Sequence, residues 1–309
     1  MTSLESENEI LQLMPPKLQR VIRTALANEP LLLEIRLRKN QPVVFCYADG
    51  VRFFKNDMLV KNYAFDVCGV TAEELEFIFA KLCHYSVYSF KESLNAGFIC
   101  LKGGSRVGVC AEAVVKEGIV CSVKNISSLS FRFARQVKTC AGEVVEKMYA
   151  NALPSTIIIG APCSGKTTLL REMCRILSSG SHGRYLKCVL LDERGEIAAM
   201  HAGMPRFDVG INTDVLSFFP KREGILNALR VLSPDFMIAD EIGSLEECAC
   251  VLQGLNSGVR FIVSLHAENL EQAKKRAQFK MLIESGHFGA AVTLGTGSAL
   301  GVIKEFVCL

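Results

Sequence analysis

The pattern of apolar and polar residues changes near the middle of the chain. Up to about residue 140, short apolar runs follow one another closely, and turn sequences such as Asp49-Gly50 separate them. This pattern is typical of strands joined as antiparallel hairpins. The sequence Thr71-Ala-Glu-Glu74 is a capping box and predicts the start of a helix. We expect helices over residues 10–28 and 71–83, and strands over 31–37, 42–47, 51–54 and within 97–121.

From about residue 156, apolar runs rich in β-branched residues alternate with segments whose apolar residues recur at helical spacing. Runs that are apolar throughout are typical of strands buried on both faces. Alternation of such strands with helices predicts a parallel sheet covered by helices on both sides. We expect strands over residues 156–159, 187–191, 236–239 and 260–265, and helices over 139–153, 167–178, 222–232, 245–257 and 269–284.

This change of pattern predicts two domains, for which 309 residues are sufficient. We expect a smaller α+β domain over residues 1–140 and an α/β domain over residues 141–309. In parallel sheets, ligands bind beyond the carboxyl ends of the strands. We therefore expect the binding and catalytic residues directly after the strands of the second domain.

Residues 160–167 match the phosphate-binding pattern G-x-x-x-x-G-K-[ST] between a predicted strand and a predicted helix. Backbone N–H groups of such a loop cradle phosphates, and the helix N-terminus adds partial positive charge. Lys166 can reach the β- and γ-phosphates, and Thr167 can bind Mg²⁺. The fold class expected is therefore a RecA-like P-loop NTPase core. The residues expected to bind ATP are Gly160, Ala161, Pro162, Cys163, Ser164, Gly165, Lys166, Thr167 and Thr168.

The apolar run over residues 236–239 ends in two carboxylates, Asp240 and Glu241. Asp240 is predicted to hold Mg²⁺ together with Thr167, either directly or through water. Glu241 is predicted to polarise the water that attacks the γ-phosphate. Such a pair alone is weak evidence, because strand ends are often merely solvated, but it stands downstream of a P-loop. Water is the expected acceptor, since the sequence suggests neither the acceptor site nor the lid of a small-molecule kinase.

The two other predicted strands also end in polar residues. Asp192-Glu193-Arg194 follows residues 187–191, and we expect Glu193 to be a further catalytic acid at the same edge. The run over residues 260–265 leads into His266, which is predicted to sense the γ-phosphate. A lone histidine is more often structural, and that alternative stays open.

Charge and composition restrict the class of partner. There are 35 Lys and Arg against 32 Asp and Glu, and Trp is absent. Nucleic-acid-binding proteins usually carry a basic stripe or aromatic stacking platforms, so we expect no direct nucleic-acid partner. A nucleic-acid-dependent RecA-type motor is the alternative. No apolar run approaches the ~18–20 residues of a membrane span, and residues 1–9 do not resemble a signal peptide. We expect a cytoplasmic protein that a partner can recruit to a membrane.

The 13 cysteines are scattered, which favours small buried apolar residues over a disulfide framework. Cys163 is the exception, because it lies in the phosphate-binding loop near Lys166 and a helix N-terminus. Those neighbours lower a thiol pKa, although an ordinary loop residue is the alternative.

Several motifs resemble known families. The segment 155–268 resembles the ATPases of type II and type IV secretion systems: Asp192-Glu193 is similar to their Asp box, Asp240-Glu241 to their Walker B motif, and residues 264–267 to their His box. A wider set of motifs resembles the stage III sporulation protein AA family, a sporulation ATPase related to the secretion motors. These motifs lie at residues 33–38, 104–108, 131–135, 192–197, 213–216 and 240–243.

This resemblance implies a homo-hexameric ATPase in the mother cell, beside integral membrane proteins of the channel between mother cell and forespore. The chain departs from the family pattern at Ser105, where a His is usual, and at Asn212, where an Arg is usual. If that Arg contacts nucleotide or a neighbouring subunit, another residue has to replace it. A nucleotide-switched scaffold with little turnover is a further alternative.

A P-loop at an open sheet edge leaves the γ-phosphate exposed on one side. An arginine from the N-terminal domain or from a neighbouring subunit can close that side, as arginine fingers do in other NTPases. Each candidate alone is more often a surface salt-bridge partner. The candidates are Arg106, Arg132 and Arg135, with Lys221 and Arg222 as weaker ones.

Overall fold

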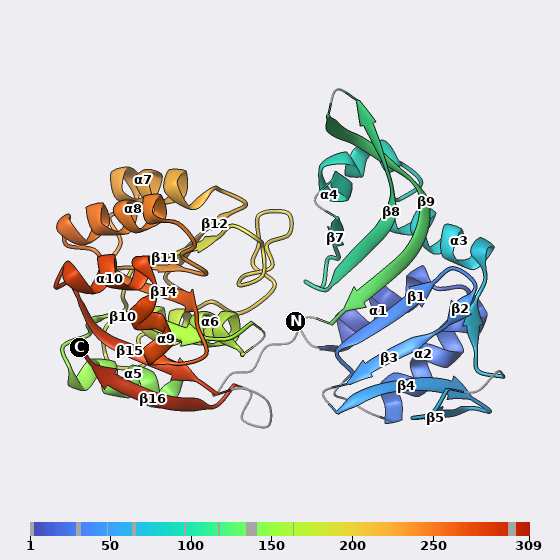
Figure 1. Cartoon of the computed structure of the whole chain (residues 1–309), viewed down its shortest axis with the longest axis horizontal. Coiled ribbons are helices and arrows are strands. Elements are labelled where there is room, and N and C mark those ends of the chain that lie inside the picture. Colours follow the sequence, from blue (N-terminus) through green and yellow to red (C-terminus); the bar gives the residue numbers. More distant parts are fainter. Residues whose placement is uncertain are drawn as a thin grey trace. The chain divides into compact units, whose positions relative to one another are not determined.

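The computed structural model describes residues 3–28, 32–47, 49–63, 66–95, 97–116, 118–133, 141–162, 164–295 and 301–309. The chain forms two compact units, Met1–Arg135 and Gln136–Leu309 (Figure 1). Each unit has its own seven-stranded sheet, and the sheet packs against one apolar core in the first unit and against one core on each face in the second.

The N-terminal unit is built on a seven-stranded sheet with the order β5-β4-β3-β1-β9-β8-β7. Every neighbouring pair in this sheet is antiparallel. A small second sheet pairs β2 with β6. The strands are β1 (Glu34–Arg38), β2 (Gln41–Pro42), β3 (Val44–Tyr47), β4 (Gly50–Lys55), β5 (Met58–Val60), β6 (Gly69–Val70), β7 (Phe98–Cys100), β8 (Arg106–Lys116) and β9 (Ile119–Arg132).

Helices of this unit bury their apolar faces against the large sheet. They are α1 (Ser3–Leu13), α2 (Pro16–Asn28), α3 (Ala72–Leu82) and α4 (Lys91–Asn95), and the 3₁₀ turn η1 (Val87–Phe90) precedes α4 without a buried residue. The capping box at Thr71 forms as predicted: its hydroxyl accepts a hydrogen bond from Glu74 N, and the Glu74 carboxylate accepts one from Thr71 N. The single helix predicted over residues 10–28 is wrong. Pro16 instead begins a second helix, in the position where its missing N–H costs nothing.

The C-terminal unit contains a seven-stranded sheet with the order β12-β11-β13-β14-β10-β15-β16. All neighbouring pairs are parallel except β15 with β16. The strands are β10 (Ser155–Gly160), β11 (Cys188–Asp192), β12 (Thr213–Ser217), β13 (Phe236–Ala239), β14 (Arg260–His266), β15 (Phe288–Leu294) and β16 (Ile303–Cys308). The helices are α5 (Gly142–Ala150), α6 (Lys166–Ser178), α7 (Lys221–Val231), α8 (Leu245–Asn256), α9 (Leu270–Lys275) and α10 (Ala277–Glu284).

Helices cover both faces of this sheet, and alternate residues of each central strand enter opposite cores. Ile158 packs with residues of α5 and α6, whereas Ile157 and Ile159 pack with residues of α7, α8 and α10. This two-sided burial explains why β10 is apolar without alternation. The α/β architecture predicted for this half of the chain is therefore present (Figure 1).

The four predicted strands of this half correspond to β10, β11, β13 and β14, and three further strands were not predicted. Along the chain, two strands, β11 and β12, therefore separate the P-loop from the Asp240-Glu241 pair. In the sheet, β12 is the edge strand beside β11. The helix predicted over residues 269–284 is wrong, because extended backbone at Arg276 divides it into α9 and α10.

Because β10, β14, β13 and β11 are parallel neighbours, their carboxyl ends meet at one edge of the sheet. Gly160 at the end of β10 pairs directly with His266 at the end of β14. The register thus brings the polar residues after these strands together.

Five of the described cysteines, Cys83, Cys174, Cys188, Cys248 and Cys250, are buried, as expected for small apolar residues. Burial raises the pKa of the Cys83 and Cys248 thiols to about 11. Cys308, by contrast, is exposed. Cys163 lies outside the described residues. Within the described ranges, no helix has both the length and the apolar character needed to cross a membrane.

Candidate functional site

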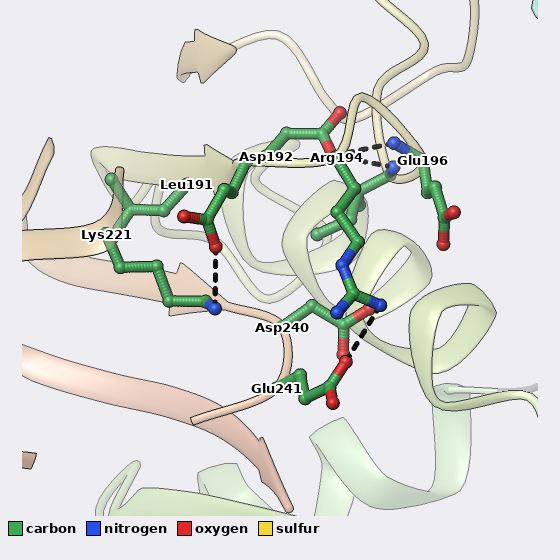
Figure 2. Close-up of a pocket in the computed structure, with 9 residues that line it drawn as sticks. Leu191, Asp192, Arg194, Glu196, Lys221, Asp240 and Glu241 are labelled. Atoms are coloured by element: carbon green, nitrogen blue, oxygen red, sulfur yellow. Dashed lines mark hydrogen bonds and ion pairs between the residues drawn. The ribbon is translucent and has the colours of Figure 1, made fainter. Parts of the chain in front are cut away.

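A cleft of about 410 Å³ lies at the carboxyl edge of the C-terminal sheet. Its lining brings together most of the residues that the sequence singled out, from the loop after β10 and from the ends of β13 and β14. The lining residues are Pro162, Ser164, Gly165, Lys166, Thr167, Thr168, Arg194, Glu196, Asp240, Glu241 and His266. Beside it, a pocket of about 20 Å³ is lined in part by Asp192, Glu193 and Lys221 (Figure 2).

Two glycines shape the loop that joins β10 to α6. A Cβ atom at Gly160 would lie 2.2 Å from Ser164 Oγ, so no larger residue fits there without moving the loop. Gly165 has a φ of 97°, a left-handed conformation that glycine adopts readily. Ser164 is buried, and its Oγ has no hydrogen-bond partner within the described residues.

Lys166, the first residue of α6, is 6% exposed, and its side chain reaches back to the start of the loop. Its Nζ donates hydrogen bonds to the carbonyl oxygens of Gly160 at 2.9 Å and Ala161 at 2.8 Å. The same Nζ lies 3.1 Å from His266 Nδ1. An ammonium group only donates, so Nδ1 accepts and the histidine proton is on Nε2.

Glu241 lies between two donors. His266 Nε2 is 3.3 Å from Glu241 Oε1, and Arg194 Nη1 is 3.0 Å from Oε2. Figure 2 shows the Arg194 side chain reaching across the pocket to this carboxylate. The backbone of Glu241 has a φ of 51°, which is uncommon for a non-glycine residue. Contacts thus link Lys166 to Glu241 through His266.

Ser264, which is fully buried in β14, positions both carboxylates at the end of β13. Its hydroxyl donates to Asp240 Oδ1 at 2.5 Å and accepts from Glu241 N at 2.8 Å. Thr167 Oγ1 donates to the other oxygen of Asp240 at 2.7 Å. No separate role for Ser264 could be predicted, because a serine inside an apolar run has no signature of its own.

Replacing Ser264 with Ala is expected to lower stability and turnover together. The substitution removes the donor to Asp240 and leaves Glu241 N without its acceptor, which costs about 1–3 kcal/mol for a buried group. Urea unfolding and phosphate release would measure the two effects. Ser257→Ala, on an exposed hydroxyl that bonds only within its own helix end, is the control. Unchanged stability and turnover in the Ser264 variant would contradict the positioning role.

The Asp192 carboxylate stabilises the loop that follows β11. Its carboxylate accepts hydrogen bonds from the backbone nitrogens of Glu196 at 2.8 Å, Ile197 at 3.1 Å and Ala198 at 2.9 Å. The buried Arg171 of α6 donates to the carbonyl oxygens of Glu196 and Ile197 at 2.7 and 2.5 Å. These contacts fix the backbone on which Arg194 and Glu196 are carried.

Glu193, the predicted further acid, accepts a hydrogen bond from Lys221 Nζ at 2.8 Å. Lys221 is buried and also lies 3.5 Å from Glu247. Glu193 lines the small pocket, whereas Glu196 from the same loop lines the large cleft. Spacing alone could not decide between the two glutamates, since the loop conformation determines which one faces the P-loop.

The structure also locates the other polar positions raised by the sequence. Asn212 immediately precedes β12, and its carbonyl accepts from Cys188 N at the amino end of β11. It therefore lies at the sheet edge opposite to the P-loop of its own unit. In the N-terminal unit, Arg106 and Arg132 line a separate cleft of about 370 Å³. Arg135 lies outside the described residues. Arg222, at the start of α7, is exposed.

The residues of the large cleft fit a phosphate group and a divalent cation. The buried Ser164 hydroxyl, the glycine-shaped loop and the Lys166 ammonium provide donors for phosphate oxygens. Thr167 and Asp240 are oxygen ligands of the kind Mg²⁺ takes. The described part of the chain has no cluster of three or more His, Cys, Asp or Glu residues suited to a metal. An ion between Thr167 and Asp240 would therefore take its remaining ligands from phosphate and water.

Comparison with known proteins identifies the family. The family model for sporulation stage III, protein AA, matches residues 4–307. The stage III sporulation protein AA of Bacillus subtilis (strain 168) is 33% identical over 300 residues, which cover 96% of this chain and 94% of that protein.

Solved structures share the fold at low identity. The Legionella pneumophila ATPase DotB has a TM-score of 0.58 at 16% identity, covering 89% of this chain and 74% of that chain. The pilus retraction motor PilT with bound ADP has a TM-score of 0.53 at 14% identity, covering 89% and 76%. The fold is thus similar to that of these ATPases, and the match to the family model together with the identity over nearly the whole chain shows that the chain belongs to the sporulation stage III protein AA family.

Proposed function

We propose that this chain is a Mg²⁺-dependent ATPase that acts as the motor of a sporulation channel or a secretion-like apparatus. The observation that carries the proposal is the cleft in which Lys166, Thr167, Asp240 and Glu241 come together. A phosphate-binding loop alone indicates binding. A carboxylate such as Glu241, held beside that loop by two donors, also supports hydrolysis.

In this proposal, the loop after β10 and the N-terminus of α6 bind the phosphates of ATP, and Lys166 neutralises their charge. Mg²⁺ between Thr167 and Asp240 would offset the charge that develops on the β- and γ-oxygens. Glu241 accepts a proton from the attacking water. The water oxygen forms a bond to the γ-phosphorus while the bond to the β-phosphate oxygen breaks, giving ADP and phosphate. His266 positions Glu241 and connects it to the phosphate-binding lysine.

We further propose a RecA-like core that works as a homo-hexamer on the mother-cell side of the channel, with integral membrane proteins as partners. Family membership supports the sporulation setting, and the likeness in fold to DotB and PilT supports a motor. The nearly balanced charge of the chain favours protein partners over nucleic acid. A contribution to the site from Glu193, and from one of Arg106, Arg132 and Arg135, stays a prediction.

The test is phosphate release by the full chain over a range of protein concentrations, with Mg²⁺ and with a chelator. We expect hydrolysis that requires Mg²⁺ and a specific activity that rises with concentration as rings assemble. Activity retained in the chelator would contradict the metal site, and a constant specific activity would contradict the oligomer. Stimulation by DNA or RNA that falls steeply with salt would favour a nucleic-acid-dependent motor.

A further inference from the structure

Arg194, on the loop after β11, lies in the large cleft together with the P-loop residues. We infer that Arg194 is the arginine that binds the γ-phosphate, supplied by the same subunit, and that it covers Glu241 until ATP arrives. The inference rests on the proposed ATPase function. It differs from the expectation that the missing arginine comes from the N-terminal domain or a neighbouring subunit.

The position of Arg194 fits such a role. Its side chain is 66% exposed, and Nη1 lies 3.0 Å from Glu241 Oε2. Both residues line the cleft that also contains Lys166 and Thr167. An exposed side chain of this length is free to turn from the carboxylate toward a phosphate bound on the P-loop.

Hydrogen bonds hold the backbone around Arg194 in place. A movement of this residue on ligand binding would therefore be confined to its side chain. The Asp192 carboxylate accepts three backbone N–H groups of the loop, and Arg171 holds two of its carbonyl oxygens. Gly195 directly follows with a φ of 64° and donates its N–H to the Asp192 carbonyl, closing a tight turn. A fixed base with a mobile guanidinium is a suitable arrangement for a ligand sensor.

The relative strength of the two contacts gives a direction to the change. An exposed ion pair such as Arg194 with Glu241 contributes little, about 0–1 kcal/mol. A guanidinium that binds phosphate oxygens in a forked geometry makes stronger, charge-assisted hydrogen bonds. The γ-phosphate therefore competes successfully for Arg194, whereas ADP has no γ-phosphate to offer.

This competition has a consequence for Glu241. While Arg194 donates to Oε2 and His266 to Oε1, each carboxylate oxygen already accepts one hydrogen bond, and the Arg194 guanidinium lies over Oε2. Transfer of Arg194 to the γ-phosphate frees Oε2 to accept a proton from the attacking water. Glu241 thus loses its competing cation when the substrate, and not the product, is bound.

The test is equilibrium binding of Mg²⁺-ADP and of a non-hydrolysable Mg²⁺-ATP analogue to the wild-type chain and to Arg194→Gln. We expect the variant to bind the analogue about 10- to 100-fold more weakly, as for loss of a hydrogen bond to a charged group, and to bind ADP as the wild type does. Arg194→Lys should recover only part of the affinity, since it keeps the charge but loses the fork. Arg184→Gln is the matched control, because Arg184 is 60% exposed and pairs with Asp235 in the same unit.

An equal loss for both nucleotides would show a structural role and overturn the inference, as would unchanged binding of both. Thermal unfolding of the variants separates misfolding from a specific effect, since Arg194 is exposed and its replacement should leave the midpoint unchanged. If the wild-type chain binds neither nucleotide, the proposed function itself fails. If it binds both and the Arg194 variant keeps the wild-type preference, only the inference fails.

Discussion

Replacing Glu241 with Gln is expected to lower the rate of ATP hydrolysis by about 10²–10⁴-fold while nucleotide binding persists. The amide keeps the size of the side chain but cannot accept a proton from water at neutral pH. Glu241 makes contacts with Arg194 and His266 rather than with the P-loop, so the phosphate-binding loop should be undisturbed. Steady-state phosphate release and equilibrium binding of ATP would measure the two quantities on the same preparation.

Glu271→Gln is the matched control, because Glu271 is exposed on α9 and pairs only with Lys274 within that helix. It should leave both turnover and binding unchanged. Turnover retained by the Glu241 variant would remove Glu241 from the reaction and would leave Glu196, the other glutamate of the cleft, as the base to examine. Loss of binding together with turnover would instead indicate that Glu241 maintains the shape of the site.

Replacing Lys166 with Ala is expected to have its largest effect on nucleotide affinity, with a loss of about 10- to 100-fold for ATP. Among the described residues that line the cleft, Lys166 is the one lysine. The substitution also leaves the carbonyl oxygens of Gly160 and Ala161 without this donor, so a modest loss of stability accompanies the loss of binding. Titration calorimetry with ATP and thermal unfolding of the free chain would separate the two effects.

Lys274→Ala removes a lysine that is exposed on α9, and it serves as the control for a change of net charge. Its affinity for ATP should equal that of the wild type. An unchanged ATP affinity in the Lys166 variant would contradict the assignment of residues 160–167 as a phosphate-binding loop.

Much of the site could be predicted because the ends of buried strands can be recognised in the sequence. β10, β13 and β14 are apolar runs that stop at Gly160, Asp240 and His266, and parallel pairing brings these ends to one edge. Strand β12 was missed because it is a partly exposed edge strand without a continuous apolar run. β16 was missed for a related reason, since it too lies at an edge and is largely exposed.

Residues whose role depends on loop conformation could not be assigned in advance. Glu193 and Glu196 differ by three positions, and only the fold of the loop after β11 shows that the second lines the cleft. Arg194 follows the acidic pair Asp192-Glu193 in the sequence, but its contact with Glu241 joins residues that are distant in sequence. Pairings of this kind follow from sheet order, which spacing along the chain does not encode.

The left-handed backbone of Glu241 carries a consequence for how this position tolerates change. Glycine or asparagine would relax that conformation, and selection for thermal stability alone would favour either of them there. If the carboxylate is needed for turnover, as proposed, the glutamate is kept there at the expense of stability. Variants recovered from a heat-challenged library should therefore fall into two groups. One group keeps Glu241 and its turnover, and the other replaces Glu241, gains melting temperature and loses turnover.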